Sequence, residues 1–183
     1  MAKTTLVTGV SGFIAKHIAL KLLAAGHAVR GTVRDLAAGE AVKLALQRGG
    51  ADPSALDLVR ADLEDDDDAG WTSAVRDVDY VMHVAAPFPL QQPRARLDLV
   101  PAAQGGTLGV LCAVQSAGTA VQRVVVTSSL AAMMYRVNRS RVVPVREEHW
   151  TDPDWPPASP YIVAKTLAER LKPAVVNIST AKT

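Results

Sequence analysis

The sequence is poor in the residues that mark several specialised classes of protein. Its one cysteine, Cys112, excludes a disulfide framework and a cysteine-based zinc site. Aromatic residues make up only 4% of the 183 residues, which argues against a surface that stacks nucleic-acid bases. An excess of charge of one sign is also lacking, because 20 lysines and arginines stand against 18 acids. A balance of +2 creates no strong field for nucleic acid or lipid, so we expect neither as a partner.

Long hydrophobic runs are missing as well. Gly9, Ser11 and Gly12 interrupt the apolar stretch near the N-terminus too early for the core of a signal peptide. No segment reaches the ~18 apolar residues of a membrane span, so we expect a cytoplasmic protein. Hydrophobic residues nevertheless make up 49% of the chain, an ordinary value for a globular protein. At ~100–200 residues per domain, residues 1–183 are expected to form a single domain.

Short apolar runs alternate along the chain with segments of helical periodicity. Strands are predicted at 6–8, 28–33, 56–59, 80–84 and 123–127, and helices at 13–25, 36–47, around 71–75 (a polar one) and 101–117. This order implies parallel strands joined by crossover helices on both faces of the sheet. The rules of handedness and adjacency then favour an α/β fold with an open, doubly wound sheet of the Rossmann type.

A glycine-rich turn joins the first predicted strand to the first predicted helix. Glycines there let the backbone approach a pyrophosphate, whose charge is stabilised by the helix N-terminus. Ala15 stands at the third small position, where it still permits close packing of helix on strand. We predict that this turn binds a dinucleotide; a tight turn without a ligand is the alternative. The expected contacts are Gly9, Ser11, Gly12, Phe13 and Ile14.

The end of the second predicted strand distinguishes between two dinucleotides. An acidic side chain there would bind the ribose 2′-hydroxyl of NAD, whereas an arginine accommodates the 2′-phosphate of NADP. The chain places Arg34 at the strand end and Asp35 one position later. We therefore predict NADP(H) as the cofactor. The alternative, a solvated pair of these two side chains, leaves NAD open.

Two further strand ends offer contacts to such a cofactor. Asp62 and Leu63 follow the third strand and are predicted to lie at the adenine amino group. Ala85 and Ala86 follow the fourth strand, where small side chains would let a nicotinamide ribose lie close. His83 belongs to an apolar strand, and we interpret it as a core histidine rather than a catalyst.

The fifth strand and a later helix carry the residues of a candidate acid–base site. Tyr161 and Lys165 are four residues apart and so share one face of the helix that Ser159 is predicted to cap. A neighbouring ammonium lowers the pKa of a tyrosine from its usual ~10, which suits proton transfer at neutral pH. A serine hydroxyl from the strand end, at Ser129, would hold the substrate oxygen. This spacing of tyrosine and lysine also arises by chance, and the glycine turn and the serine pair favour the catalytic interpretation.

Several segments together resemble the extended short-chain dehydrogenases/reductases, in the branch of dihydroflavonol reductases, cinnamoyl-CoA reductases and microbial carbonyl reductases. They follow the order of that family over nearly the whole chain, at 8–15, 32–35, 80–87, 106–111, 124–129 and 161–170. The resemblance implies that Ser129 orients a carbonyl and that Tyr161 donates the proton. It also implies that Lys165 binds the nicotinamide ribose while lowering the tyrosine pKa, and that Thr127 and Tyr161 lie at the cofactor. A homodimer through helices near 101–117 and 160–172 is a further implication.

The chain departs from that family in two places. Met134 stands where plant dihydroflavonol reductases have an asparagine that holds the flavonoid, which favours a smaller or more apolar carbonyl substrate. Members of the family also continue into a C-terminal lobe that forms much of the substrate pocket. This sequence stops at Thr183, so we expect that lobe to be missing and residues 172–178 to supply a sixth strand. A proline-rich loop at 136–158 leaves the carboxyl end of the fifth strand, where ligands of such sheets bind.

The function predicted on these grounds is an NADP-dependent oxidoreductase that reduces an aldehyde or ketone by hydride transfer, with Tyr161 as proton donor. The expected partner is a small carbonyl substrate. An NAD-dependent nucleotide-sugar epimerase or dehydratase would use the same three catalytic side chains, but Arg34 speaks against it. A non-catalytic dinucleotide-binding module is the alternative from another class, and the missing lobe motivates it.

Overall fold

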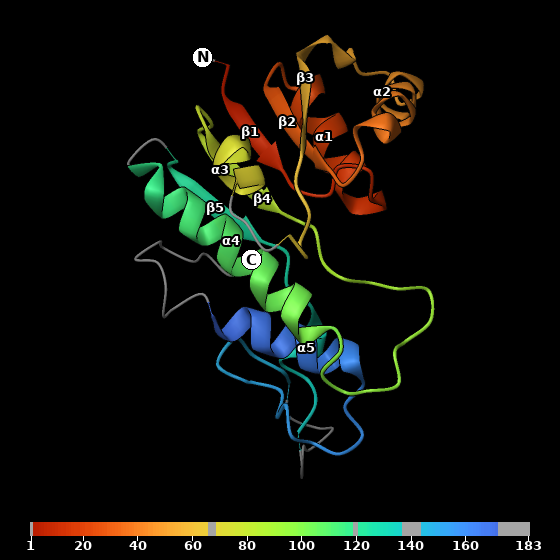
Figure 1. Cartoon of the computed structure of the whole chain (residues 1–183), viewed down its shortest axis with the longest axis vertical. Coiled ribbons are helices and arrows are strands. Elements are labelled where there is room, and N and C mark those ends of the chain that lie inside the picture. Colours follow the sequence, from red (N-terminus) through yellow and green to blue (C-terminus); the bar gives the residue numbers. More distant parts are fainter. Residues whose placement is uncertain (1, 66–68, 119–120, 137–143, 172–183) are drawn as a thin grey trace.

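The computed structural model describes residues 2–65, 69–118, 121–136 and 144–171. Its centre is a sheet of five parallel strands, flanked by helices (Figure 1). The strands are β1 (Thr4–Val7), β2 (Ala28–Val33), β3 (Leu56–Arg60), β4 (Tyr80–His83) and β5 (Arg123–Val126). Their boundaries lie within two residues of the prediction. The predicted sixth strand, at 172–178, falls outside the described residues.

The strand order is β3-β2-β1-β4-β5, so the chain winds outward from β1 in one direction and then crosses to β4 and β5 in the other. The predicted doubly wound sheet of the Rossmann type is confirmed. In such sheets the direction of winding reverses between two central strands, here β1 and β4. Ligands bind in the crevice at the carboxyl ends of these strands.

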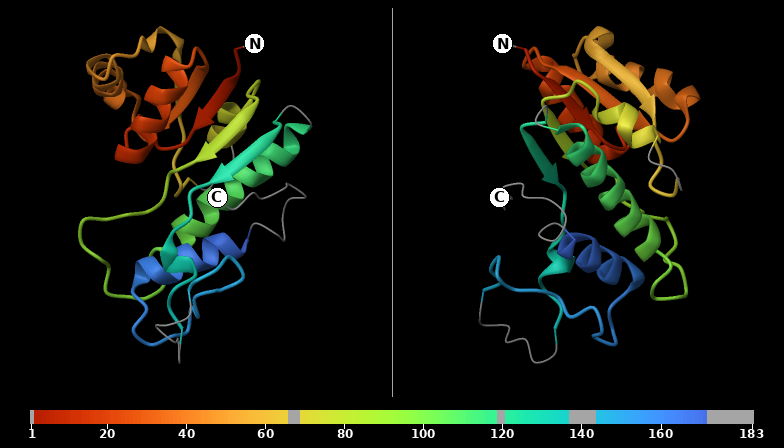
Figure 2. Two further views of the ribbon diagram at one scale, coloured as in Figure 1. Left: turned by 180° about the vertical axis from the view of Figure 1, so that it is seen from behind. Right: turned by 60° about the vertical axis from the view of Figure 1, so that its left-hand side comes forward.

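The described residues form the helices α1 (Phe13–Ala24), α2 (Gly39–Arg48), α3 (Ala69–Val75), α4 (Val100–Ser116) and α5 (Pro160–Arg170), of which the first four cover the two faces of the sheet. Successive strand residues point to opposite faces, and β1 shows this with Leu6 and Val7. Leu6 is buried in a cluster with α3 and α4, whereas Val7 is buried in a second cluster with α1 and α2. Figure 2 shows the sheet with helices on its two faces in two further views.

Two helical segments differ from their prediction. The segment at 36–47 begins as a short 3-10 turn (Leu36–Ala38), because the carboxylate of Asp35 accepts the backbone N–H of Ala37 before α2 starts. The helix around 71–75, expected to be polar, instead buries Trp71, whose indole packs against Gly109 of α4. A Cβ at Gly109 would stand 2.7 Å from Trp71 Cδ1, so the glycine makes room for the ring.

Helix α5 lies across the N-terminal half of α4, beyond the carboxyl end of β5 (Figures 1 and 2). Its start follows the prediction, because Ser159 Oγ accepts the N–H of Ile162 and Pro160 occupies the first turn. The two helices meet through a small apolar cluster of Leu99, Ala103 and Ala164. None of the helices in the described part of the chain is long and apolar enough to cross a membrane.

Candidate functional site

The glycine-rich turn after β1 closely approaches the chain that leaves β4. Gly9 has φ +65°, a conformation that favours glycine, and a Cβ there would stand 3.1 Å from Ala85 Cβ. The turn closes on itself through a hydrogen bond of 2.8 Å from Gly12 N to Gly9 O. Gly9 N also donates to Thr32 Oγ1 of β2 at 2.9 Å. The turn is therefore held close to β2 and to the chain that leaves β4.

The N-terminus of α1 is open. Gly12 is its N-cap residue, so no side chain satisfies the first N–H groups from that position, and the first turn carries no acidic residue. Ser11 and Gly12 are exposed, as are Phe13 (77%) and Ile14 (54%). Free N–H groups and the positive end of the helix dipole favour an anion at this point. The residues predicted to contact a dinucleotide thus share one accessible surface.

Thr8 joins the glycine turn to the chain that leaves β4. Its Oγ1 accepts the backbone N–H groups of Val84 and Ala85, each at 2.9 Å. The same atom lies 3.0 Å from Nδ1 of His83, and Nε2 of that ring lies 3.5 Å from Thr107 Oγ1 on α4. His83 is 3% exposed and is hydrogen-bonded in the core, as interpreted from the sequence.

Arg34, predicted to bind the 2′-phosphate of NADP, has an accessible side chain. It is exposed directly after β2, and the turn is hydrogen-bonded to that strand through Val10 N and Thr32 O at 2.9 Å. Asp35, beside it, has its carboxylate engaged with Ala37 N at 2.8 Å. An arginine at the surface and an acid used as a cap agree with the prediction for NADP, whose test is given in the Discussion.

Asp62 and Leu63 follow β3, as predicted, and differ in what their side chains do. Asp62 is half-buried, and its Oδ1 accepts the N–H of Glu64 at 3.4 Å. Nearby, hydrogen bonds from Arg60 hold the pKa of the Asp65 carboxyl below its usual value. The Leu63 side chain packs against Gly106 of α4 and belongs to the core, so a contact with adenine would come from its backbone.

A cleft that is partly open to solvent lies beyond the carboxyl ends of β4 and β5. It brings together most of the residues predicted for the nicotinamide end of the cofactor and for catalysis. Among the residues that line it are Ala85, Ala86, Thr127, Ser128, Tyr161, Lys165 and Glu169. The chain segments that supply them are far apart in the sequence and meet only because α5 crosses α4.

Within this cleft, Tyr161 and Lys165 are oriented by neighbouring groups. Lys165 Nζ donates to the carbonyl oxygen of Thr127 at 3.2 Å, which ties α5 to the end of β5. The ring of Tyr161 meets that of Phe88 edge to face. The backbone N–H of Tyr161 also donates to Gln92 Oε1 at 3.3 Å. Both candidate catalytic side chains therefore face the same cleft, as their spacing predicts.

The two serines after β5 have different surroundings. Ser128 lines the cleft. Ser129, the serine predicted to orient a substrate, caps the 3-10 turn η4 (Leu130–Ala132), and its Oγ accepts the N–H of Ala131 at 3.1 Å. An oxygen that accepts this bond keeps its own proton to donate. Since η4 packs against α5, Ser129 stands at the start of a segment in contact with the helix of Tyr161.

Sequence reasoning missed several residues that line the cleft, and also Phe88, which contacts Tyr161 beside it. Phe88 and Glu169 were not singled out, and Thr107 was noted only as part of a segment. Glu169 stands four residues after Lys165, a helical spacing that could have revealed it, and it is 9% exposed. Phe88 gives no such signal, because it lies in a loop whose path depends on contacts with α5. The described residues of the predicted loop, 136 and 144–158, contain neither helix nor strand.

Comparisons with known proteins agree with this arrangement. Residues 5–177 match a family described as the NAD dependent epimerase/dehydratase family. The chain is 36% identical to tetraketide alpha-pyrone reductase 2 of Arabidopsis thaliana over 173 residues, which cover 90% of this chain and 51% of that protein. It is also 36% identical to dihydroflavonol 4-reductase of Zea mays, over 91% of this chain and 46% of that protein.

A solved structure is similar over the same extent. The chain resembles Gre2 from Candida albicans, determined in complex with NADPH, with a TM-score of 0.79 and 27% identity. The match covers 94% of this chain and 52% of that one. The resemblance to reductases of the short-chain type, inferred from the sequence segments, is confirmed. The chain spans about half the length of the curated relatives that it matches.

Proposed function

Because the chain belongs to the NAD dependent epimerase/dehydratase family, we propose that it binds NADP(H) and takes part in the reduction of an aldehyde or ketone. The observation that carries this proposal is the shared cleft at the carboxyl ends of the strands. Tyr161, Lys165 and the chain after β4 face it together, and the glycine turn is hydrogen-bonded to that chain through Thr8. Its curated relatives are named as reductases, and Gre2 was determined with NADPH.

The residues present fit a dinucleotide. Gly9 lies so close to Ala85 that a Cβ would crowd this turn, and the N-terminus of α1 is open for a pyrophosphate. Arg34 would bind the 2′-phosphate, and Ala85 and Ala86 would leave room for the nicotinamide ribose beside Lys165. When bound, the reduced nicotinamide supplies the hydride that the carbonyl carbon receives.

The protein's own groups would act on the carbonyl oxygen. As negative charge develops there, the Tyr161 hydroxyl donates a hydrogen bond and then its proton. Ser129 would donate a second hydrogen bond to the same oxygen. Its Oγ accepts the N–H of Ala131, which leaves the hydroxyl proton for the substrate. The Lys165 ammonium, fixed to Thr127 O at 3.2 Å, places a positive charge on the same helical face as the phenol. The ring of Phe88 beside Tyr161, and Met134 five residues after Ser129 in the chain, favour a small or apolar substrate.

The test is turnover of NADPH with a panel of aldehydes and ketones. Tyr161→Phe is expected to abolish turnover while the Kd for NADPH stays within about threefold, because the ring and its packing on Phe88 are kept. Tyr135→Phe is the matched control, since that ring stacks on Trp155 instead. Full turnover by Tyr161→Phe would exclude the proposed proton donor.

A non-catalytic dinucleotide-binding module is the second candidate, and the observation behind it is that the chain spans about half the length of its relatives. It predicts thermal stabilisation by NADPH, because a ligand of the native state alone stabilises it, without oxidation of NADPH by any carbonyl compound. A homodimer through α4 and α5 stays a prediction. Light scattering at several protein concentrations tests it.

A further inference from the structure

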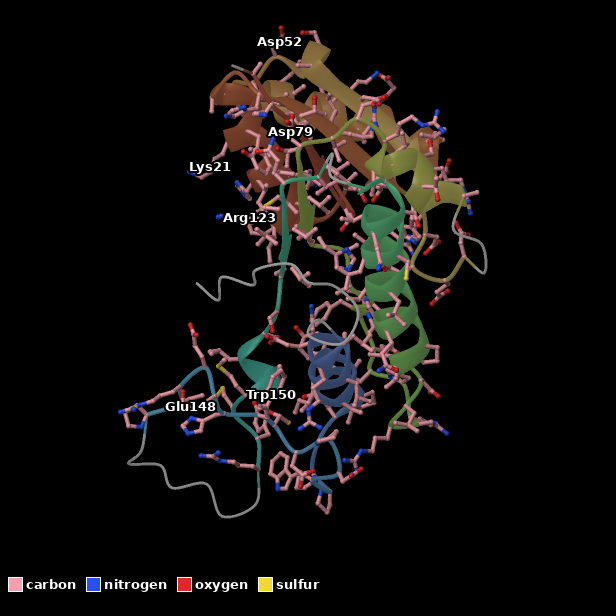
Figure 3. All side chains as sticks on the ribbon, turned by 90° about the vertical axis from the view of Figure 1, so that its left-hand side faces the viewer. Lys21, Asp52, Asp79, Arg123, Glu148 and Trp150 are labelled. Atoms are coloured by element: carbon pink, nitrogen blue, oxygen red, sulfur yellow. The ribbon has the colours of Figure 1, made fainter. Side chains whose placement is uncertain are left out.

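Thr151 is a polar residue buried in the loop that precedes α5. None of its surface is exposed. A buried hydroxyl needs hydrogen-bond partners, because leaving one unsatisfied in the interior destabilises the fold. Its partners lie on two segments that the proposed reaction needs. Figure 3 shows the neighbouring Trp150 beside the turn η4 and close to α5.

Three of the hydrogen bonds of Thr151 hold the segment that begins with Ser129. Its Oγ1 donates to Ala131 O at 2.6 Å and accepts from Tyr135 N at 3.0 Å. Its backbone N–H donates to Ala132 O at 2.8 Å. The turn η4 is therefore held at two of its three carbonyl groups and at the chain that leaves it. Since Ser129 caps this turn, its hydroxyl is placed by the same contacts.

A fourth bond connects Thr151 to the helix of Tyr161 and Lys165. Arg170 Nη2, in the last turn of α5, donates to Thr151 O at 3.1 Å. The Arg170 guanidinium also lies 5.5 Å from the centroid of the Trp150 ring, over its face, which holds the same stretch of loop against α5. One buried residue thus links the turn capped by Ser129 to α5.

We propose that Thr151 is a positioning residue that sets the Ser129 hydroxyl relative to the Tyr161 phenol. The inference rests on the proposed function, since both groups must reach one carbonyl oxygen. The tie at the cleft, from Lys165 to Thr127 O, fixes only the end of β5. The Ser129 side chain lies two residues further along the chain, in the segment that the hydrogen bonds of Thr151 hold in place. A displacement of about 1 Å in such a site can lower a rate about 100-fold.

The test compares Thr151→Val with Thr151→Ser in the 183-residue chain. Valine keeps the branched shape and removes both bonds of Oγ1, whereas serine keeps the hydroxyl. We expect Thr151→Val to lower kcat about 10- to 100-fold with the Kd for NADPH unchanged, and Thr151→Ser to restore most of it. Thr166→Val is the matched control. Thr166 is equally buried, but its hydroxyl bonds only within α5, to Ile162 O at 2.8 Å.

Amide hydrogen exchange supplies a readout that needs no turnover. The N–H groups of Ala131 and Tyr135 are bonded to Ser129 Oγ and Thr151 Oγ1, so both should exchange at least about tenfold faster in Thr151→Val and not in Thr166→Val. Unchanged exchange, or a kcat within twofold of the wild type, overturns the positioning role. An inactive wild-type chain counts against the proposed function alone, and exchange then decides whether Thr151 holds the turn.

If Thr151→Val does not fold, Arg170→Met provides the second variant, because Arg170 is exposed and its loss removes the two contacts that tie this loop to α5, the bond to Thr151 O and the contact with the Trp150 ring. We expect a loss in kcat of about 3- to 10-fold with unchanged affinity for NADPH. A kcat equal to that of the wild type overturns the proposed link between Thr151 and α5.

Discussion

The ring of Phe88 meets the ring of Tyr161 edge to face, with centroids 5.2 Å apart and planes at 82°. Phe88 is 69% exposed, so it contributes little to the core, yet it borders the phenol that is proposed to donate the proton. The loop after β4 thereby supplies the small residues Ala85 and Ala86 that line the cleft, and also the aromatic ring that contacts Tyr161.

Removal of this ring should impair the reaction more than the fold. An edge-to-face pair contributes about 0.5–1.5 kcal/mol, so Phe88→Ala is expected to lower kcat/KM by about 2- to 12-fold with little change in Tm. Leu90→Ala is the control, since Leu90 lies in the same loop and is fully exposed. Equal effects of the two variants in steady-state kinetics would rule out a specific role for the contact.

Alanine substitutions at Gly9 and Gly26 distinguish the effect of backbone strain from the effect of crowding a neighbouring segment. Both have positive φ, but a Cβ at Gly9 would meet Ala85 at 3.1 Å, whereas one at Gly26 would meet nothing within 4 Å. Alanine at either position costs about 1–2 kcal/mol for the left-handed conformation. Only Gly9→Ala should also weaken NADPH binding, by more than tenfold in a fluorescence titration. Normal affinity in Gly9→Ala would place the cofactor elsewhere.

Arg34 is expected to decide which dinucleotide binds. A hydrogen bond to a charged group contributes about 1.5–3 kcal/mol, so Arg34→Gln should weaken NADPH by about 10- to 150-fold and leave NADH nearly unchanged. Arg48→Gln, an exposed arginine at the end of α2, is the control for charge. Thermal shift with each dinucleotide measures both affinities. A chain that binds NADH better than NADPH before mutation would favour the epimerase alternative.

An ion pair at the end of the sheet opposite the cleft is expected to make the stability of the protein depend on pH. Asp79 lies before β4 and accepts hydrogen bonds from Lys3 Nζ at 2.7 Å and from Thr4 N at 2.9 Å. The bond from Lys3 holds the pKa of the Asp79 carboxyl below its usual 3.8 and raises the pKa of the Lys3 amine above 10.5. Because the folded-state pKa of Asp79 is the lower one, its stabilisation is present above pH 3.8 and is lost as the pH falls below it.

Asp79→Asn is therefore expected to lower the urea midpoint at neutral pH and to approach the wild-type midpoint in acid. The amine acts in the opposite sense, since its raised pKa keeps its stabilisation below pH 10.5 and loses it above. Asp52→Asn is the comparison for a carboxyl whose pKa is also lowered, but by hydrogen bonds from Ser54 within its own turn rather than by a tie between strands, so its loss should be the smaller one. A deficit in Asp79→Asn that does not change with pH would show that the charge does not contribute.

Local patterns determined much of this protein. The alternation of apolar runs with helical periods predicted the five strands, and the wide spacing between them implied parallel crossovers. The glycine at position 9 and the four-residue step from Tyr161 to Lys165 are also local features. The geometry of a tight turn or a helical face is set by neighbouring residues, so spacing alone reveals it.

The tertiary structure decided the contacts between distant segments. Trp71 enters the space left by Gly109, Phe88 meets Tyr161, and Thr151 bridges a turn and a helix. Residue types in these pairs carry no periodic signal, because their separation in the chain has no relation to their separation in space. The packing of α3 on α4 brings the first pair together, and the packing of α5 against α4 and η4 brings the others together. Such packing depends on the summed burial of many side chains rather than on any single motif.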